Sequence, residues 1–270
     1  MPLLLIKGTF RPGAGVADGD TVRFAADDPN LPFRLMRQGS TPRVSEQTGT
    51  IPIRYEGIDA MERGARTPES SDATRRNLEL LGLSGPNDEG RGHILSRLLD
   101  TNGRVIAFVF AGDAPEEDGT EVFVDVDRVR NSVNWRLLDG GNAYPLFYDT
   151  LFADLRQELG QVAAAAESAD RGVWREDATN TGLAWGGRAS LATLPPFMPK
   201  LWRRLEDYSS DRLFREFADT LDAFPEYLRT RNDRLLVVPE NRFTGLDNVV
   251  TVSGNRLSLD VPQQQLVFVS

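Results

Sequence analysis

The first half of the chain is organised in short apolar runs, several of which alternate with polar positions, as half-buried β-strands do. The predicted strands span residues 3–10, 21–24, 31–36, 51–55, 104–110 and 121–126. In the run 51–55, Ile51, Ile53 and Tyr55 share one face and leave Arg54 on the other, because side chains alternate along a strand. The pattern predicts an all-β start.

Helical spacing appears between and after these strands. The predicted helices span residues 71–82, 132–138 and 148–168 in the first part of the chain, and 199–208 and 211–231 in the second. An apolar stripe from Leu213 to Leu228 supports the last of these helices, with Pro225 expected to kink it. Short strands then close the chain at 234–238, 249–252, 257–261 and 266–269, with a hairpin turn at Ser253-Gly254-Asn255.

A glycine- and proline-rich stretch, 179–199, separates these two patterns and is the best linker candidate. We therefore expect a first domain over 1–176, a linker over 177–199, and a C-terminal accessory domain of helices and then short strands over 200–270. That last region carries no motif. It is expected to pack on the first domain, to pair two copies of the chain, or to bind a partner protein.

Composition narrows the chemistry. The 270 residues include no cysteine and one histidine, His93, which excludes thiolate catalysis and any zinc or iron–sulfur site built on several Cys or His ligands. Catalysis would rest on carboxylates, arginines, hydroxyls or a metal held by oxygen. Arginines make up 29 of the 31 basic residues, an excess that a genome of biased composition explains as well as phosphate binding does.

Four short features of the first domain bear on function. They are Asp18-Gly19-Asp20-Thr21, Arg54, the pair Asp59 and Glu62, and Gly103-Arg104. Each has an ordinary structural explanation when taken alone. Asp-Gly-Asp suits a tight turn, Arg54 and Asp59 can form a surface ion pair, and Gly103-Arg104 can be a hairpin with a basic flank.

In their order and spacing, however, these features closely resemble the staphylococcal-nuclease-like family, the thermonucleases. The chain has the Asp-Gly-Asp-Thr turn at 18–21, then Arg-x-x-x-x-Asp-x-x-Glu from Arg54 to Glu62, then Gly103-Arg104. Val133-Asn134, Gly141-Asn142-Ala143 and the closing Gly172-Val173-Trp174 continue the likeness to about residue 176. The resemblance implies an α+β fold with an OB-type five-stranded β-barrel and packed helices, followed by a C-terminal extension of unknown fold.

The resemblance also implies roles for particular residues. Asp20, Asp59 and the backbone carbonyl of Ala60 would hold Ca²⁺, a hard cation that prefers oxygen ligands. Arg54 and Arg104 would bind the phosphate and stabilise the charge that grows on it in the transition state. Glu62 would orient or deprotonate the attacking water.

Two positions depart from the family pattern. Ala60-Met61 stands where the family usually has Thr-Pro, and the loss of proline frees the loop that carries Glu62, so weaker activity or metal affinity is expected. The family's nucleotide-stacking tyrosines have no clean match. Phe147 or Tyr148 can stack a base, and each can equally be a core residue.

These expectations describe a calcium-dependent hydrolase, a nuclease of DNA or RNA that favours single strands and leaves 3′-phosphate ends. The alternative is a catalytically weak or inactive OB-type module that binds nucleic acid or protein. No signal peptide or membrane span is visible, which favours the cytoplasm.

The net charge of −9 first argues against nucleic acid. Residues 1–176 hold 20 Lys and Arg against 28 Asp and Glu, a net −8, whereas residues 177–270 hold 11 against 12, a net −1. The acidity therefore lies in the predicted nuclease domain. Substrate binding should be local, weak and metal-dependent, with a shallow dependence on salt.

Overall fold

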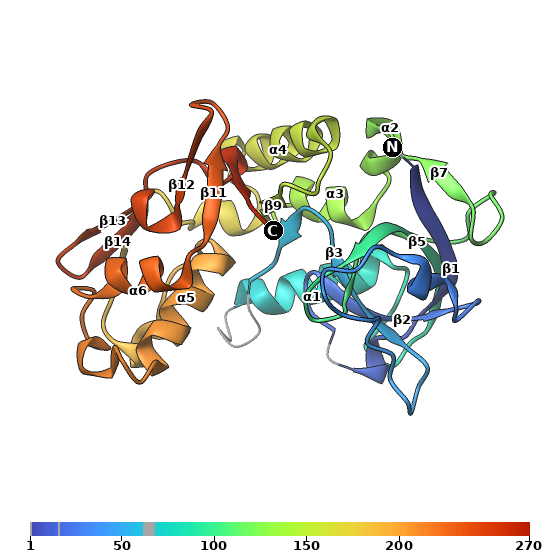
Figure 1. Cartoon of the computed structure of the whole chain (residues 1–270), viewed down its shortest axis with the longest axis horizontal. Coiled ribbons are helices and arrows are strands. Elements are labelled where there is room, and N and C mark those ends of the chain that lie inside the picture. Colours follow the sequence, from blue (N-terminus) through green and yellow to red (C-terminus); the bar gives the residue numbers. More distant parts are fainter. Residues whose placement is uncertain (1, 16, 62–67) are drawn as a thin grey trace.

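The computed structural model describes residues 2–15, 17–61 and 68–270, and it is an α+β protein built around a closed five-stranded barrel (Figure 1). The strands of this first part are β1 (Pro2–Phe10), β2 (Thr21–Ala26), β3 (Ile51–Tyr55), β4 (Ile58–Asp59), β5 (Gly90–Leu99), β6 (Val105–Ala111) and β7 (Glu121–Phe123). The barrel order is β2-β3-β6-β5-β1, and β1 closes it by pairing with β2, Phe10 opposite Phe24. This arrangement confirms the expected barrel and is consistent with the OB type.

Helices and two very short strands follow the barrel. They are α1 (Pro68–Leu80), α2 (Val126–Arg130), α3 (Val133–Asp139), β8 (Tyr144–Pro145), β9 (Phe147–Tyr148) and α4 (Ala153–Ser168). Ser132 caps α3 by accepting a hydrogen bond from the Trp135 amide, which satisfies one of the free donors at the start of the helix. α3 packs against α4, on one side of the barrel (Figure 1).

The C-terminal part combines two helices with two small sheets. Its elements are β10 (Leu183–Ala184), α5 (Pro199–Ser210), α6 (Phe224–Arg231), β11 (Arg234–Val237), β12 (Arg242–Gly245), β13 (Val250–Ser253), β14 (Arg256–Leu259) and β15 (Leu266–Phe268). β13 and β14 form the expected hairpin, in which Gly254 takes a positive φ of 57°. β15 pairs in parallel with β9, which ties the end of the chain to the segment that follows the barrel.

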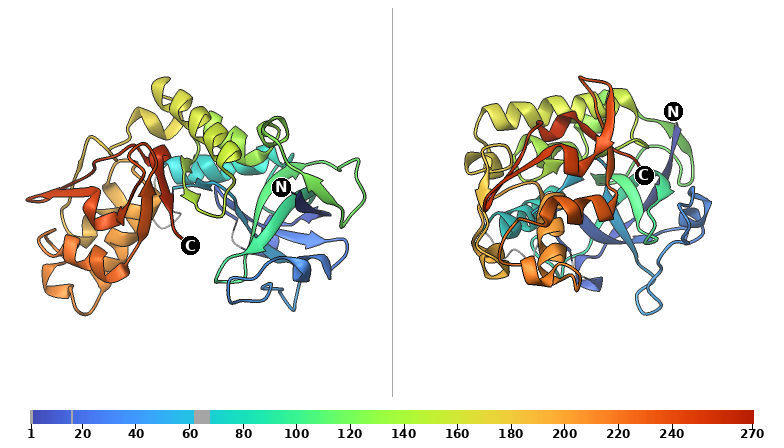
Figure 2. Two further views of the ribbon diagram at one scale, coloured as in Figure 1. Left: turned by 45° about the horizontal axis from the view of Figure 1, so that its top comes forward. Right: turned by 60° about the vertical axis from the view of Figure 1, so that its left-hand side comes forward.

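Two apolar clusters make up the core. One fills the barrel and the adjoining faces of α1, α3 and α4, and the other lies among the C-terminal elements and includes Tyr144, Trp174 and Trp202. α4 contributes Leu155 and Leu159 to the first cluster and Ala166 to the second. The two views of Figure 2 show α4 running between the barrel and the C-terminal part.

Several expected elements differ from the structure. The run 31–36, expected to be a strand, begins as a 3₁₀ helix at Leu31–Arg34, with Pro32 in its first turn. The expected helix 211–231 is reduced to a short 3₁₀ turn and α6, because Pro225 stands in the first turn of α6 and begins that helix instead of kinking a longer one. Leu213, assigned to the apolar stripe, is 82% exposed.

The longest strand, β5, was not expected from the sequence. Seven of its ten residues are buried, among them Ser96, so apolar and polar positions do not alternate along it. Residues 177–199 contain β10 and bury Trp185, Phe197 and Met198 in the second cluster, although this segment was expected to be a linker. The domain boundaries themselves stay a prediction.

No helix in the described ranges is both long and apolar enough to span a membrane.

Candidate active site

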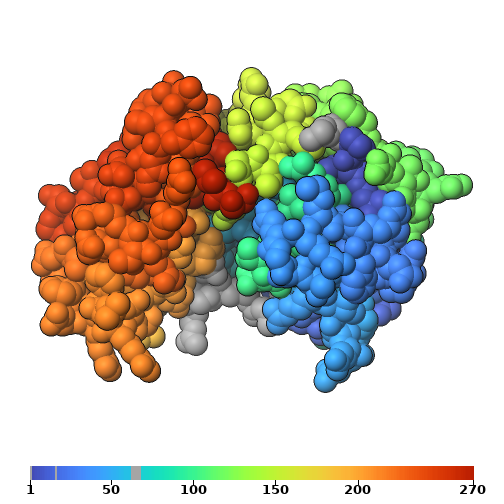
Figure 3. Space-filling model, in the orientation of Figure 1, coloured from blue at the N-terminus to red at the C-terminus, as the bar shows by residue number. Residues whose placement is uncertain are grey.

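A cavity of about 550 Å³ lies where the barrel meets the C-terminal part. The barrel side contributes Asp18, Asp20, Thr21, Gln38, Arg54, Asp59, Ala60, Met61, Asp100, Thr101, Asn102, Arg104 and Ile106. The opposite side contributes Leu146, Tyr148, Thr150, Lys200, Arg203, Arg204 and Ser270. Figure 3 shows the molecule hollowed between these two parts. Segments far apart in the sequence therefore form one site.

Strand register brings Asp20, Arg54 and Arg104 together. β2 pairs with β3 so that Thr21 is opposite Arg54, and Asp20 directly precedes Thr21. On the other side β3 pairs with β6, with Arg54 opposite Ile106. Arg104 lies two residues before Ile106, and side chains repeat every second residue along a strand, so Arg104 is directed to the same face.

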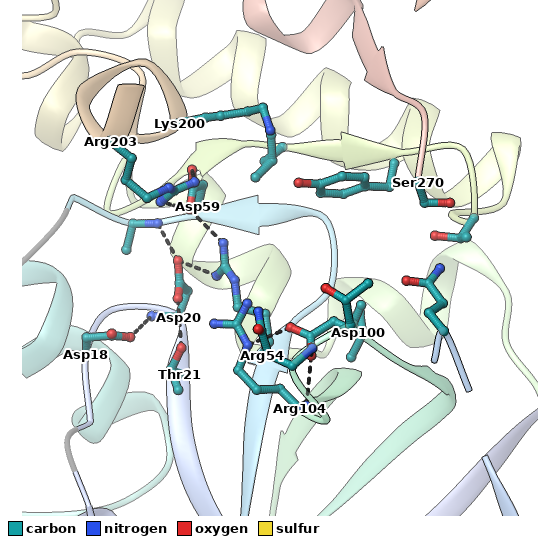
Figure 4. Close-up of a pocket in the computed structure, with 18 of the residues that line it drawn as sticks. Asp18, Asp20, Thr21, Arg54, Asp59, Asp100, Arg104, Lys200, Arg203 and Ser270 are labelled. Carbon is teal, nitrogen blue, oxygen red and sulfur yellow. Dashed lines mark hydrogen bonds and ion pairs between the residues drawn. The ribbon is translucent and has the colours of Figure 1, made fainter. Parts of the chain in front are cut away.

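A tight turn after β3 brings the chain back beside Arg54. Gly57 takes a φ of +76°, a conformation that favours glycine, and β4 then pairs with β8, with Asp59 opposite Tyr144. The turn places the carboxylate of Asp59 beside the guanidinium of Arg54, whose Nη2 donates to Asp59 Oδ1 at 2.6 Å. Figure 4 shows Asp20, Arg54 and Asp59 facing one another.

Arg54 is the centre of this group. It forms ion pairs with both Asp20 and Asp59. Burial alone would lower the pKa of Arg54, but the two carboxylates outweigh this effect and raise the pKa above its ordinary value. Arg54 therefore carries a fixed charge that the two aspartates orient.

Asp59 is 2% exposed and receives a second guanidinium from the C-terminal part. Arg203 on α5 donates from Nη1 to Oδ1 at 3.1 Å and from Nη2 to Oδ2 at 2.8 Å. Burial alone would raise the pKa of Asp59, but Arg203 and Arg54 together hold it below its ordinary value. The carboxylate is thus kept ionised although it is buried.

Arg104 lies below Arg54 in the view of Figure 4 and is held by the turn that precedes it. Asp100 accepts a hydrogen bond from the Arg104 backbone amide at 2.8 Å and from its Nε at 2.6 Å. Gly103, with a φ of +73°, completes this turn. Because Asp100 binds the guanidinium through Nε, the side chain is restrained next to the cavity (Figure 4).

The other residues expected at the site do not all lie at the cavity. Ala60 lies at the site, where its amide donates to Asp20 Oδ2 at 2.6 Å, and Met61 is buried in the second cluster. Glu62 lies outside the described residues. Phe147 is buried in the first cluster and does not line the cavity, which fits the core alternative, whereas Tyr148 lines the cavity wall opposite the barrel.

The carboxylate oxygens of the site are the kind of ligand that a hard divalent cation prefers. Asp20 and Asp59 offer two carboxylates that both bind the guanidinium of Arg54, and Ala60 contacts Asp20 through its amide N–H, which is not a metal ligand. Over residues 2–15, 17–61 and 68–270, no cluster of three or more His, Cys, Asp or Glu suited to a metal is found. A cation here would have two carboxylate ligands and would compete with Arg54 and Arg203 for them.

Sequence reasoning missed the cationic residues of α5. Lys200, Arg203 and Arg204 all line the cavity. Their spacing, i, i+3 and i+4, places them on one helical face, and this signal was visible in the predicted helix 199–208. What the sequence lacked was any indication that this face meets the barrel.

Neither a scan against protein-family models nor a search of the curated proteins finds a match for this chain.

Proposed function

We propose that this protein is a calcium-dependent nuclease that hydrolyses phosphodiester bonds of DNA or RNA, as the likeness to the thermonucleases implies. One observation carries the proposal. Asp20, Arg54, Asp59 and Arg104 come from separate segments of the barrel region, and they all line one cavity. The same residues form the sequence motif, so the motif and the geometry support the same site.

The two barrel arginines suit the reaction. Attack on a phosphodiester adds negative charge to the equatorial oxygens, and a fixed cation aimed at those oxygens lowers the barrier. Arg54 is held by two carboxylates and Arg104 by Asp100, so both are oriented before substrate arrives. Their planar guanidinium groups can bind two phosphate oxygens at once.

Asp20, Asp59 and the Ala60 carbonyl would hold Ca²⁺, which would neutralise phosphate charge when bound. In this proposal Glu62 orients or deprotonates the attacking water. Tyr148, on the opposite wall, offers an aromatic face to a base of a single strand. The products would carry 3′-phosphate ends.

The test is a gel assay with single-stranded DNA at millimolar Ca²⁺ and with EDTA. Arg104→Ala and Glu62→Gln should each lower the cleavage rate at least 100-fold, about the loss expected when one oriented charge or one general base is removed. Arg91→Ala, which removes an exposed barrel arginine paired with Asp27, is the matched control and should leave the rate unchanged. No calcium-dependent cleavage by the unmodified protein would refute the proposal.

A non-cutting nucleic-acid-binding module is the second candidate. One observation favours it: Asp59 already holds two guanidinium groups, so a cation must compete with them. Calcium-independent binding of single-stranded DNA without cleavage in the same assay would select this candidate.

A further inference from the structure

The face of α5 that meets the barrel carries three cations. Lys200, Arg203 and Arg204 lie on this face, while Leu201, Trp202 and Leu205 are buried in the second cluster. Figure 4 shows Lys200 and Arg203 above the Asp20–Arg54–Asp59 group, across the cavity from Arg104. The C-terminal part therefore supplies a positively charged wall to the site.

Two of these cations fix the helix in place. Lys200 Nζ lies 3.1 Å from Asp233 Oδ1 and 4.4 Å from the centre of the Phe268 ring. Arg204 binds both oxygens of Asp233, at 2.6 and 2.9 Å. These contacts tie α5 to the residue that precedes β11 and to β15, while Arg203 is directed toward Asp59 on the barrel side.

Arg203 differs from its two neighbours on this face in being more exposed, since the side chains of Lys200 and Arg204 are only 10% and 19% exposed. The side chain of Arg203 is 34% exposed, and it donates two parallel hydrogen bonds to Asp59. A phosphate offers the same two-oxygen geometry to a guanidinium. If Arg203 turned to a phosphate, Asp59 would keep its ion pair with Arg54.

We infer that Arg203 is a substrate-binding residue that moves from Asp59 to a backbone phosphate of a single-stranded nucleic acid. Neutralising Asp59, as a divalent cation would, favours this exchange because it removes the competing anion. Binding of strand and cation would then support each other through Arg203. The inference deepens the proposed function by assigning the C-terminal part to substrate binding, and it rests on nucleic acid being the ligand.

The experiment measures binding without cleavage. Fluorescence anisotropy with a labelled dT8 oligonucleotide in EDTA, over a range of salt concentrations, compares the unmodified protein with Arg203→Ala, Arg203→Lys and Arg229→Ala. Each phosphate contact to a single strand contributes about 0.7 to the slope of log K against log salt. Arg203→Ala should lower the slope by about this amount, while Arg203→Lys should preserve it. Arg229, exposed on α6 and paired with Glu226, is the matched control and should leave the slope unchanged.

Asp59→Asn provides the second arm. It should tighten dT8 binding about fivefold, and adding Arg203→Ala should abolish this gain. If Asp59→Asn does not fold, the slopes of the first arm decide alone, because a merely structural arginine would change affinity without changing the slope.

Equal slopes for the unmodified protein and Arg203→Ala, or no binding of dT8 at low salt, would overturn the inference. The gel assay tests the proposed nuclease activity independently of this binding experiment. Binding through Arg203 without calcium-dependent cleavage would refute the nuclease and keep this inference, and cleavage with equal slopes would do the reverse.

Discussion

At the scale of single residues, the two carboxylates on either side of the turn at Gly57 have pKa values shifted in opposite directions. Asp59 has two guanidinium partners, which hold its pKa low in spite of burial. Glu56, three residues earlier, has no bonded cation among the residues that the structure describes, and burial raises its pKa to about 7 although Arg97 and Arg54 oppose the change. Direct pairing, more than depth, decides whether a carboxylate near this site is charged.

Glu56 should therefore make stability depend on pH. Its carboxyl group holds a proton more tightly in the folded protein than in the unfolded chain, so stability should fall as pH rises from about 4.5 to about 7. We expect a loss on the order of 1 kcal/mol, because the residue keeps some contact with solvent. Denaturant unfolding at pH 5 and pH 8 should show this loss in the unmodified protein but not in Glu56→Gln. Glu121→Gln, at an exposed position of β7, should behave as the unmodified protein does.

At the scale of elements, the turn between β3 and β4 determines whether Arg54 and Asp59 meet. Two constraints act at Gly57. Its positive φ favours glycine, and a Cβ there would lie only 2.6 Å from Leu159 Cδ1 on α4. Gly82, after α1, has a similar φ of +75° and no neighbour within 4 Å of such a Cβ. The two glycines thus share the same backbone requirement and differ in packing.

Gly82→Ala should cost about 1 kcal/mol of unfolding free energy, the cost of a left-handed residue with a side chain. Gly57→Ala should cost about 2–3 kcal/mol, because Leu159 must also shift. Chemical denaturation of both variants gives the comparison. Equal losses would show that the Leu159 contact contributes nothing.

At the scale of the whole molecule, β15 joins the end of the chain to the wall of the cavity. Phe268 pairs with Tyr148 in the β15–β9 ladder, is 2% exposed, and lies under the ammonium group of Lys200. The core of the C-terminal part therefore also positions α5. The cavity depends on both parts of the molecule.

Phe268→Ala should lower the free energy of unfolding by about 3–5 kcal/mol, as expected for a large buried side chain. Phe243→Ala, on β12 with the side chain 65% exposed, is the matched control and should change it by less than about 1 kcal/mol. Denaturant titrations measure both. A small effect at Phe268 would mean that β15 is not needed to hold the C-terminal part together.

The sequence by itself determined the features that depend on local pattern. Short apolar runs bounded by turns predicted β1, β2 and β6, and alternation predicted β3. Turn residues placed Asp20 and Arg104 at strand ends, and motif spacing selected Arg54 and Asp59 as site candidates. Tertiary structure decided what depends on long-range burial: β5 lacks alternation because most of its residues are buried, and Phe147 became a core residue while Tyr148 lines the cavity. The contact of Arg203 with Asp59 joins residues 144 positions apart, and no local periodicity encodes such a meeting. The packing of α5 within the C-terminal part, across the cavity from the barrel, brought this arginine into the site.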